Sequence, residues 1–186
     1  DDEEAKKALS LAYENGINFY DTALGYGNGH SEKLVAQAVG DEKGVVIASK
    51  IPPENMEWPA NPHARADDAF SKAYVIKTAK TSFANLGNRP IDLMQLHVWH
   101  DKWLNDNGWH DGLVALRDEG IINHFGVSVN SLQPETAVKL AESGKAESFQ
   151  VIYNIFEQRP EDNLFPAAQK AKSGIIARVP FDEGSL

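Results

Sequence analysis

The chain contains no cysteine and little positive charge. The absence of cysteine excludes disulfides and thiolate chemistry and fits a reducing compartment, so we expect a cytoplasmic protein. Against 27 aspartates and glutamates stand only 18 lysines and arginines, which gives a formal net charge of -9. Because nucleic acid is bound by basic surfaces, this balance argues against a nucleic-acid partner.

Long apolar runs are also absent. No stretch is long enough to cross a membrane, so we expect no membrane partner. The length of 186 residues and the hydrophobic share of 42% suit one globular domain with a sizeable core. No shift in composition marks a linker, and we therefore predict a single domain over residues 1–186.

Short apolar runs alternate with segments of helical periodicity along the chain, a pattern typical of parallel βαβ units. Strands are predicted at 19–21, 45–50, 91–97, 124–128, 148–154 and 174–180. Helices are predicted at 2–15, 31–40 with Ser31 as N-cap, 73–86, 112–119, 134–144 and 164–173. Such an α/β series predicts a (β/α)8 TIM barrel. A doubly wound sheet is the alternative, but no Gly-x-Gly-x-x-Gly fingerprint follows a strand.

Three of the predicted strands end in a titratable residue: Asp21, Lys50 and His97. Tyr26 follows the first of them in a glycine-flanked loop. Because the active sites of barrels lie at the C-terminal strand ends, we expect these four side chains to form a catalytic group.

Each of the four also has a structural interpretation. His97 alone is more often a satisfied buried histidine, and Asp21 alone would cap the next turn. Lys50 would sit exposed at a loop entrance, and Tyr26 would anchor its loop. Because each of the four lies at a predicted strand end or in the loop just past one, the set favours a catalytic group over four separate structural roles.

Several motifs occur in a consistent order along nearly the whole chain. They are Asp21-Thr-Ala-Leu-Gly-Tyr-Gly-Asn-Gly-His-Ser-Glu32, Lys50, Asp92-Leu-Met-Gln-Leu-His97, Gly126-Val-Ser128, Phe149-Gln-Val-Ile-Tyr-Asn154 and Ala177-Arg-Val-Pro-Phe181. Together they resemble the aldo-keto reductase superfamily. The resemblance implies an oxidoreductase that reduces a small-molecule aldehyde or ketone with NADPH. Compared with the family, we expect the chain to lack the first strand and the eighth β/α unit, and so to hold about strands two to seven.

The four candidate residues suit carbonyl reduction. A tyrosine holds its proton near neutral pH, and an ammonium within hydrogen-bond reach lowers its pKa by roughly 1–3 units. We expect Lys50 to act in this way, with Asp21 holding Lys50 charged and in place. The resemblance supports Tyr26 as general acid and His97 as a hydrogen-bond donor to the carbonyl oxygen.

The resemblance also implies contacts with the nicotinamide. Ser128 and Gln150 match positions that hold its carboxamide, for which a hydroxyl and an amide are suitable partners. In the family an asparagine usually follows the serine, whereas Val129 intervenes here before Asn130.

Two further cofactor contacts are expected near the end of the chain. Arg178 stands where many relatives stack an aromatic ring on the nicotinamide, and its planar guanidinium suits stacking. A surface salt bridge is the alternative for Arg178. Gly184 and Ser185 are expected to offer backbone N–H groups to the pyrophosphate.

The aromatic content of two predicted loops bears on the substrate. These are the loop from Ile51 to Asp67 and the loop after His97. All four tryptophans lie in or beside these loops: Trp58, Trp99, Trp103 and Trp109. One interpretation is a site for an apolar or aromatic carbonyl compound, and the other is a hydrophobic roof over the barrel.

Other functions fit the sequence less well. No metal site is expected, because His97, His100 and Asp101 straddle a strand end and its loop instead of sharing a helical face. A nicotinamide-binding regulatory protein without turnover is one alternative. A barrel aldolase with Lys50 as Schiff-base nucleophile is another. A third is an inactive fragment with two open sheet edges.

Overall fold

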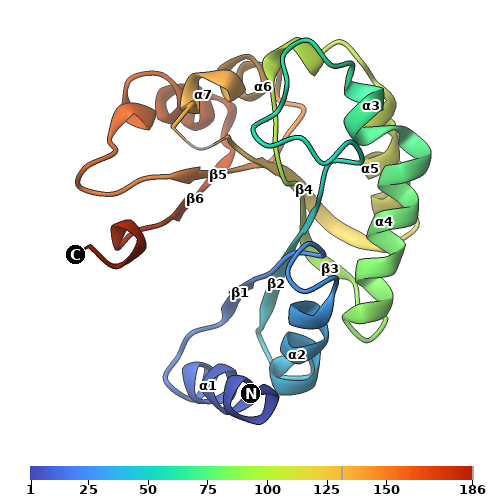
Figure 1. Ribbon diagram of the computed structural model, residues 1–186, viewed down its shortest axis with the longest axis vertical. Helices are drawn as coiled ribbons and strands as arrows, with labels where there is room; N and C mark the ends of the chain where they lie inside the picture. The colour runs from blue at the N-terminus through green and yellow to red at the C-terminus, as the bar shows by residue number, and fades with distance from the viewer. Residues whose placement is uncertain (131, 186) are drawn as a thin grey trace.

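The computed structural model describes residues 1–130 and 132–185. Its strands form one parallel six-stranded sheet in the order β1-β2-β3-β4-β5-β6. The strands are β1 (Phe19–Asp21), β2 (Val46–Ile51), β3 (Ile91–Leu96), β4 (Ile122–Ser128), β5 (Ser148–Ile152) and β6 (Gly174–Arg178). The sheet curls around an open side, with β1 and β6 as its two edges and the helices outside the curl (Figure 1).

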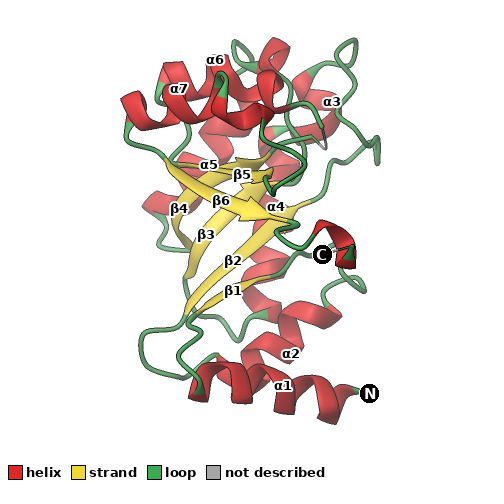
Figure 2. Ribbon diagram, turned by 90° about the vertical axis from the view of Figure 1, so that its left-hand side faces the viewer, coloured by secondary structure: helices red, strands yellow, loops and turns green. Residues whose placement is uncertain are grey.

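The helices follow the strands in alternation. They are α1 (Asp2–Glu14), α2 (His30–Val39), α3 (Ala66–Phe70), α4 (Lys72–Asn85), α5 (Gly108–Asp118), α6 (Val138–Ser143) and α7 (Leu164–Ala171). Single 3-10 turns are η1 (Asp101–Trp103), η2 (Pro134–Ala137), η3 (Arg159–Glu161) and η4 (Asp182–Gly184). Figure 2 shows α1 and α2 together below the sheet, with α6 and α7 at its other end. Among the described residues, no helix has the length and apolar character needed to cross a membrane.

The order of the strands in the sheet decides between the two predicted α/β folds. A doubly wound sheet reverses its strand order at a switch point, whereas here each strand pairs with the next one along the chain. Consecutive parallel pairing in a curled sheet with helices outside is the arrangement of a (β/α)8 barrel, of which the chain forms six strands. The predicted fold class is confirmed.

The predicted N-cap of α2 is wrong. The helix begins at His30, and its N-cap is Gly29, whose φ of 85° is one that glycine adopts readily. The hydroxyl of Ser31 accepts a hydrogen bond from Thr22 Oγ1 at 2.8 Å. Ser31 therefore joins the helix to the residue after Asp21.

One helix was not predicted, and another begins earlier than expected. The long loop after β2 ends in the unpredicted helix α3, where the backbone N–H of Arg65 donates to Asp68 Oδ2 at 3.1 Å. Helix α5 begins at Gly108, before the predicted start at 112. A Cβ at Gly108 would lie 2.6 Å from Asp67 Oδ1, so a glycine permits this close approach to α3.

Strand register separates a polar inner face from an apolar outer one. Lys50 pairs with Gln95, Gln95 with Gly126, and Gly126 with Ser148, which places all four on the same face of the sheet. Gly126 leaves room for Ser148, whose Oγ would lie 2.2 Å from an added Cβ. Most of the alternate residues are apolar and pack beneath the helices, among them Ile47, Met94, Phe125 and Phe149.

Candidate active site

The predicted site residues gather at the C-terminal edge of the sheet. Asp21 is the last residue of β1, Lys50 lies one residue before the end of β2, and His97 directly follows β3. Ser128 and Arg178 end β4 and β6. Because parallel strands all end at the same edge, side chains from separate βα units meet there.

Lys50 and Asp21 form a close ion pair on this edge. Lys50 Nζ lies 2.6 Å from Asp21 Oδ2 and donates a second hydrogen bond to the carbonyl oxygen of Thr22 at 2.8 Å. The Lys50 side chain is 1% exposed and that of Asp21 is 30% exposed. Burial lowers the pKa of Lys50, and the Asp21 carboxylate opposes this change. Asp21 thus stabilises the charged form of a lysine that is neither exposed nor at a loop entrance.

Tyr26 lies above this pair. Lys50 Nζ lies over the Tyr26 ring, 5.3 Å from its centroid. Burial, followed by the charge of Asp21, raises the pKa of Tyr26, while Arg178 lowers it. The hydrogen bonds of Lys50 go to Asp21 and to the carbonyl oxygen of Thr22, and its ammonium lies over the Tyr26 ring. That Lys50 lowers the pKa of Tyr26 stays a prediction, and Arg178 is a second cation that favours the phenolate.

His97 completes the group from β3. Its ring packs edge-on against Tyr26, with 5.8 Å between centroids, and against Trp58, with 4.6 Å. Burial, then the nearby cations Lys50 and Arg178, lowers the pKa of His97 to about 3. Its Nδ1 is buried and finds no hydrogen-bond partner among the described residues. His97 is therefore neutral at ordinary pH and is not a satisfied core histidine.

These side chains open onto a cavity of about 550 Å³. That volume lies within the range of sites that take small molecules and cofactors. The cavity is lined by Asp21, Tyr26, Trp58, Pro59, His97, Val98, Ser128, Val129, Asn130, Gln150, Arg178 and Val179. The structure thus brings together three of the four catalytic candidates and four of the six cofactor candidates on one cavity, with Lys50 buried beside it.

The four cofactor candidates in the cavity differ in how their polar atoms are used. Gln150 Oε1 is buried and has no hydrogen-bond partner among the described residues. Asn130 Oδ1 accepts from the backbone N–H of Ala60 at 3.2 Å, so this side chain also fixes the loop after β2. Arg178 Nη2 donates to the carbonyl oxygen of Val129 at 3.4 Å, within the cavity wall and not on the outer surface.

The remaining two cofactor candidates lie elsewhere. Gly184 and Ser185 follow β6 and are not among the residues that line the cavity. The hydroxyl of Ser185 donates to the carbonyl oxygen of Asp182 at 3.0 Å, so it is used within its own turn.

A second cavity, of about 560 Å³, adjoins the first and is more apolar. Tyr26, Trp58 and His97 line both cavities and form the boundary between them. The other lining residues of the second cavity are Leu24, Gly25, Asn28, Pro52, Met56 and Tyr74. Tyr26 and His97 can therefore contact molecules on both sides at once.

The tryptophans divide between the two interpretations. Trp99, Trp103 and Trp109 are at most 2% exposed and pack edge-on against one another, with centroids 4.8 and 6.1 Å apart. These three form a roof over the core. Only Trp58, which is 48% exposed, borders the two cavities.

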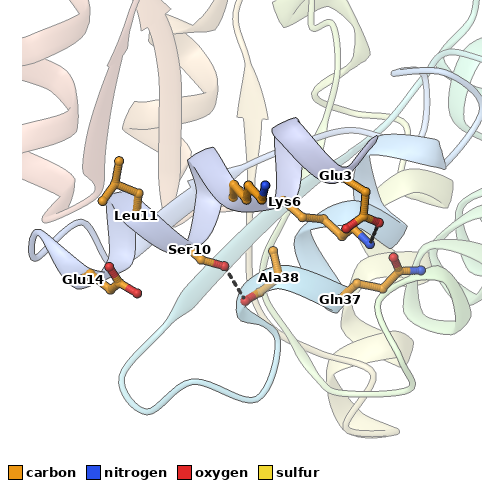
Figure 3. Close-up of a pocket in the computed structure, with 8 residues that line it drawn as sticks. Glu3, Lys6, Ser10, Leu11, Glu14, Gln37 and Ala38 are labelled. Carbon is orange, nitrogen blue, oxygen red and sulfur yellow. Dashed lines mark hydrogen bonds and ion pairs between the residues drawn. The ribbon is translucent and has the colours of Figure 1, made fainter. Parts of the chain in front are cut away.

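A third hollow lies away from this edge, between α1 and α2 (Figure 3). Its polar groups pair with each other: Lys6 Nζ lies 2.5 Å from Glu3 Oε1, and Ser10 Oγ donates to the carbonyl oxygen of Ala38 at 3.4 Å. In the part of the chain that the structure describes, no group of three or more histidine, aspartate or glutamate side chains is placed to hold a metal ion.

Two features of the site were not predicted from the sequence. The carbonyl oxygen of Thr22 accepts the second hydrogen bond of Lys50. The sequence indicates this contact only through the position of Thr22 directly after Asp21. The hydrogen bond from Ala60 to Asn130 closes the loop after β2 over the cavity, and no local pattern around Ala60 signals it.

Comparison with known proteins identifies the family of the chain. The family model described as "Aldo/keto reductase family" matches residues 1–186. An uncharacterized oxidoreductase of Bacillus subtilis, YqkF, is 30% identical over 98% of this chain and 58% of its own length. The chain thus spans somewhat more than half the length of the relatives it matches.

Solved structures show the same similarity. Aldo-keto reductase AKR11C1 from Bacillus halodurans, in its holo form, superposes with a TM-score of 0.81 at 26% identity, covering 99% of this chain and 59% of that one. An aldo/keto reductase from Klebsiella pneumoniae, solved in complex with NADP and acetate, has the same fold, with a TM-score of 0.76 at 23% identity over 98% and 59% of the two chains. The chain belongs to the aldo/keto reductase family.

Proposed function

We propose that the protein reduces aldehydes or ketones to alcohols with NADPH, and that Tyr26 donates the proton. The observation that carries this proposal is the placement of Tyr26 and neutral His97 beside the ion pair of buried Lys50 and partly exposed Asp21, at the boundary of two cavities. One cavity suits a polar cofactor group and the other an apolar substrate.

The four residues can act together on a carbonyl group. When bound, the dihydronicotinamide supplies a hydride to the carbonyl carbon. As the carbonyl π bond breaks, its oxygen takes the hydroxyl proton of Tyr26. Arg178 and Lys50 are the cations near the resulting phenolate and stabilise it. Neutral His97 keeps an N–H with which to orient the carbonyl oxygen.

The first cavity, which Ser128, Gln150 and Arg178 line, suits the nicotinamide carboxamide. Gln150 Oε1 is a buried acceptor without a partner among the described residues, and a carboxamide N–H satisfies it. Ser128 lines the same cavity and offers a hydroxyl to the amide oxygen. The NADP of the Klebsiella pneumoniae structure supports the choice of cofactor. We further propose that residues 1–186 are one domain, equivalent to strands two to seven of the family's barrel.

The test is NADPH consumption with 4-nitrobenzaldehyde, using protein expressed from its complete reading frame. We expect one alcohol to be formed for each NADPH oxidised. NADPH binding without turnover on any of a panel of aldehydes and ketones would replace this proposal with a regulatory, non-catalytic role.

The pH dependence of the reduction should lack the inflection that a catalytic histidine usually gives. Because the pKa of His97 is lowered from 6.5 to about 3, His97 stays neutral above about pH 5. Because the pKa of Tyr26 is raised from 10.0, its proton is lost only as pH rises through that higher value. We expect kcat for reduction to be flat from about pH 6 to 9. A step in kcat near pH 6.5 would show that His97 titrates in the active protein.

The apolar cavity should select the substrate through Trp58. We expect Trp58→Ala to raise the KM for 4-nitrobenzaldehyde about tenfold, which corresponds to losing about 1.4 kcal/mol of contact with the aromatic ring. Propanal, which is too small to cover the indole, serves as the control, and its KM should change about twofold or less. Equal changes for both aldehydes would place the aromatic substrate outside this cavity.

A further inference from the structure

Glu32 is a fully buried carboxylate behind the candidate active site. It is the third residue of α2 and is 0% exposed. Its Oε1 accepts a hydrogen bond from Ser49 Oγ at 2.5 Å, and its Oε2 accepts one from Asn85 Nδ2 at 2.8 Å. Neither partner is charged. Burying a carboxylate between neutral donors costs free energy that an apolar side chain of similar size would not.

The two partners of Glu32 lie on different elements. Ser49 is the residue before Lys50 in β2, and its side chain points to the opposite face of the strand. Asn85 ends α4 and packs against Gly29, where an added Cβ would lie 2.3 Å from Asn85 Nδ2. Glu32 therefore ties the start of α2 to the strand that carries Lys50.

The start of α2 in turn holds the Tyr26 loop. The backbone N–H of Ser31 donates to the carbonyl oxygen of Tyr26 at 3.3 Å, and that of Gly29 donates to Leu24 at 2.8 Å. At the other end of the loop, the N–H of Leu24 donates to the carbonyl oxygen of Lys50 at 3.2 Å. The loop is thus attached to β2 directly at Leu24, and through Glu32 at the far side of Tyr26.

We infer that Glu32 is a positioning residue that sets the separation between the Tyr26 ring and Lys50 through its hydrogen bond to Ser49. The inference rests on the proposed function for its catalytic consequence. Hydrogen bonds from two directions fix a helix terminus more narrowly than an apolar contact does. The need for these directional hydrogen bonds explains why a carboxylate is buried at a position where an apolar side chain could also fill the space.

The variant that tests the inference is Ser49→Ala, measured against Ser173→Ala. Each variant loses one serine hydroxyl, and Ser173 Oγ donates to the carbonyl oxygen of Ala146 at 3.0 Å, far along the chain from the Tyr26 loop. Glu32→Gln is the conservative variant, since its amide can accept from Asn85 and donate to Ser49. Two quantities are measured: kcat for NADPH-dependent reduction, and amide hydrogen exchange at Gly29 and Ser31.

We expect Ser49→Ala to lower kcat about tenfold with a nearly unchanged Kd for NADPH, because small displacements of a catalytic group are costly. Exchange at Gly29 and Ser31 should also quicken about tenfold. Ser173→Ala should change neither quantity, and Glu32→Gln should fall between Ser49→Ala and wild type. If Ser49→Ala matches Ser173→Ala in both quantities, the inference is overturned. Exchange is read without turnover, so an inactive wild type would refute the proposed function while exchange still decides the role of Glu32.

Discussion

Replacing Tyr26 with phenylalanine should lower kcat for aldehyde reduction about a thousandfold, within the range that general acids contribute. The change removes one oxygen and leaves the ring that packs against His97 and lies over Lys50. The loop should keep its shape, because the backbone of Tyr26 holds it: the Tyr26 N–H donates to the carbonyl oxygen of Ala23, and the Tyr26 carbonyl oxygen accepts from Ser31. The loss should therefore appear in kcat, with the Kd of NADPH close to that of wild type.

The control for this prediction is Tyr13→Phe. Tyr13 lies in α1, lines neither cavity, and donates its hydroxyl proton to the carbonyl oxygen of Lys43 at 3.1 Å, so the variant removes a phenolic hydroxyl away from the proposed site. We expect it to keep kcat within about threefold of wild type. A Tyr26→Phe enzyme that retains a tenth or more of wild-type turnover would show that another group supplies the proton.

Asp21→Asn should lower the free energy of unfolding by about 2 kcal/mol, because it leaves Lys50 buried without its counter-charge. The full cost of breaking a buried pair is not expected, since the Asp21 side chain is 30% exposed. The pKa of Lys50 is already lowered by burial, and loss of the carboxylate lowers it further. Reduction should weaken as well, because the ammonium beneath the Tyr26 ring loses the carboxylate that holds it in place. Urea denaturation at neutral pH measures the change in stability.

Glu119→Gln is the matched control for Asp21→Asn. It removes the charge from an ion pair of similar length, with Lys80 Nζ 2.7 Å from Glu119 Oε2, but both side chains are 48% exposed. Exposed pairs contribute little, and we expect a change below about 0.5 kcal/mol. Equal losses in the two variants would mean that the Lys50–Asp21 pair behaves as a surface pair.

The placement of three candidate catalytic residues followed from the sequence because each stands at or next to the end of a predicted strand. The parallel arrangement then places Asp21, Lys50 and His97 on one edge, whatever the details of packing. The fold class was predictable for the same reason, since regular alternation of strand and helix admits few arrangements.

The finer geometry was not predictable. Whether Lys50 lies at the hydroxyl or beneath the ring of Tyr26 depends on where α2 begins and how the loop closes. That closure is set by contacts far apart in sequence, such as Asn85 with Glu32 and Ala60 with Asn130. Local sequence patterns do not predict such contacts.

Which tryptophans are buried could not be predicted from the sequence either. The sequence places four tryptophans near the catalytic face, but three of them belong to the roof of the core. Helix α5 begins early enough to include Trp109, which packs on Trp99 with 4.8 Å between centroids. The glycine that allows this start, Gly108, weakens the helical pattern at the same position.

Hydride transfer from NADPH to a carbonyl carbon is the reaction proposed for this site. It is tested with NADPH that carries deuterium in place of both hydrogens of its reactive ring carbon, with 4-nitrobenzaldehyde and protein expressed from its complete reading frame. Mass spectrometry of the product should show 4-nitrobenzyl alcohol with one deuterium at the carbinol carbon in wild type, and almost none formed by Tyr26→Phe. Unlabelled alcohol, or none with wild type, would contradict the account.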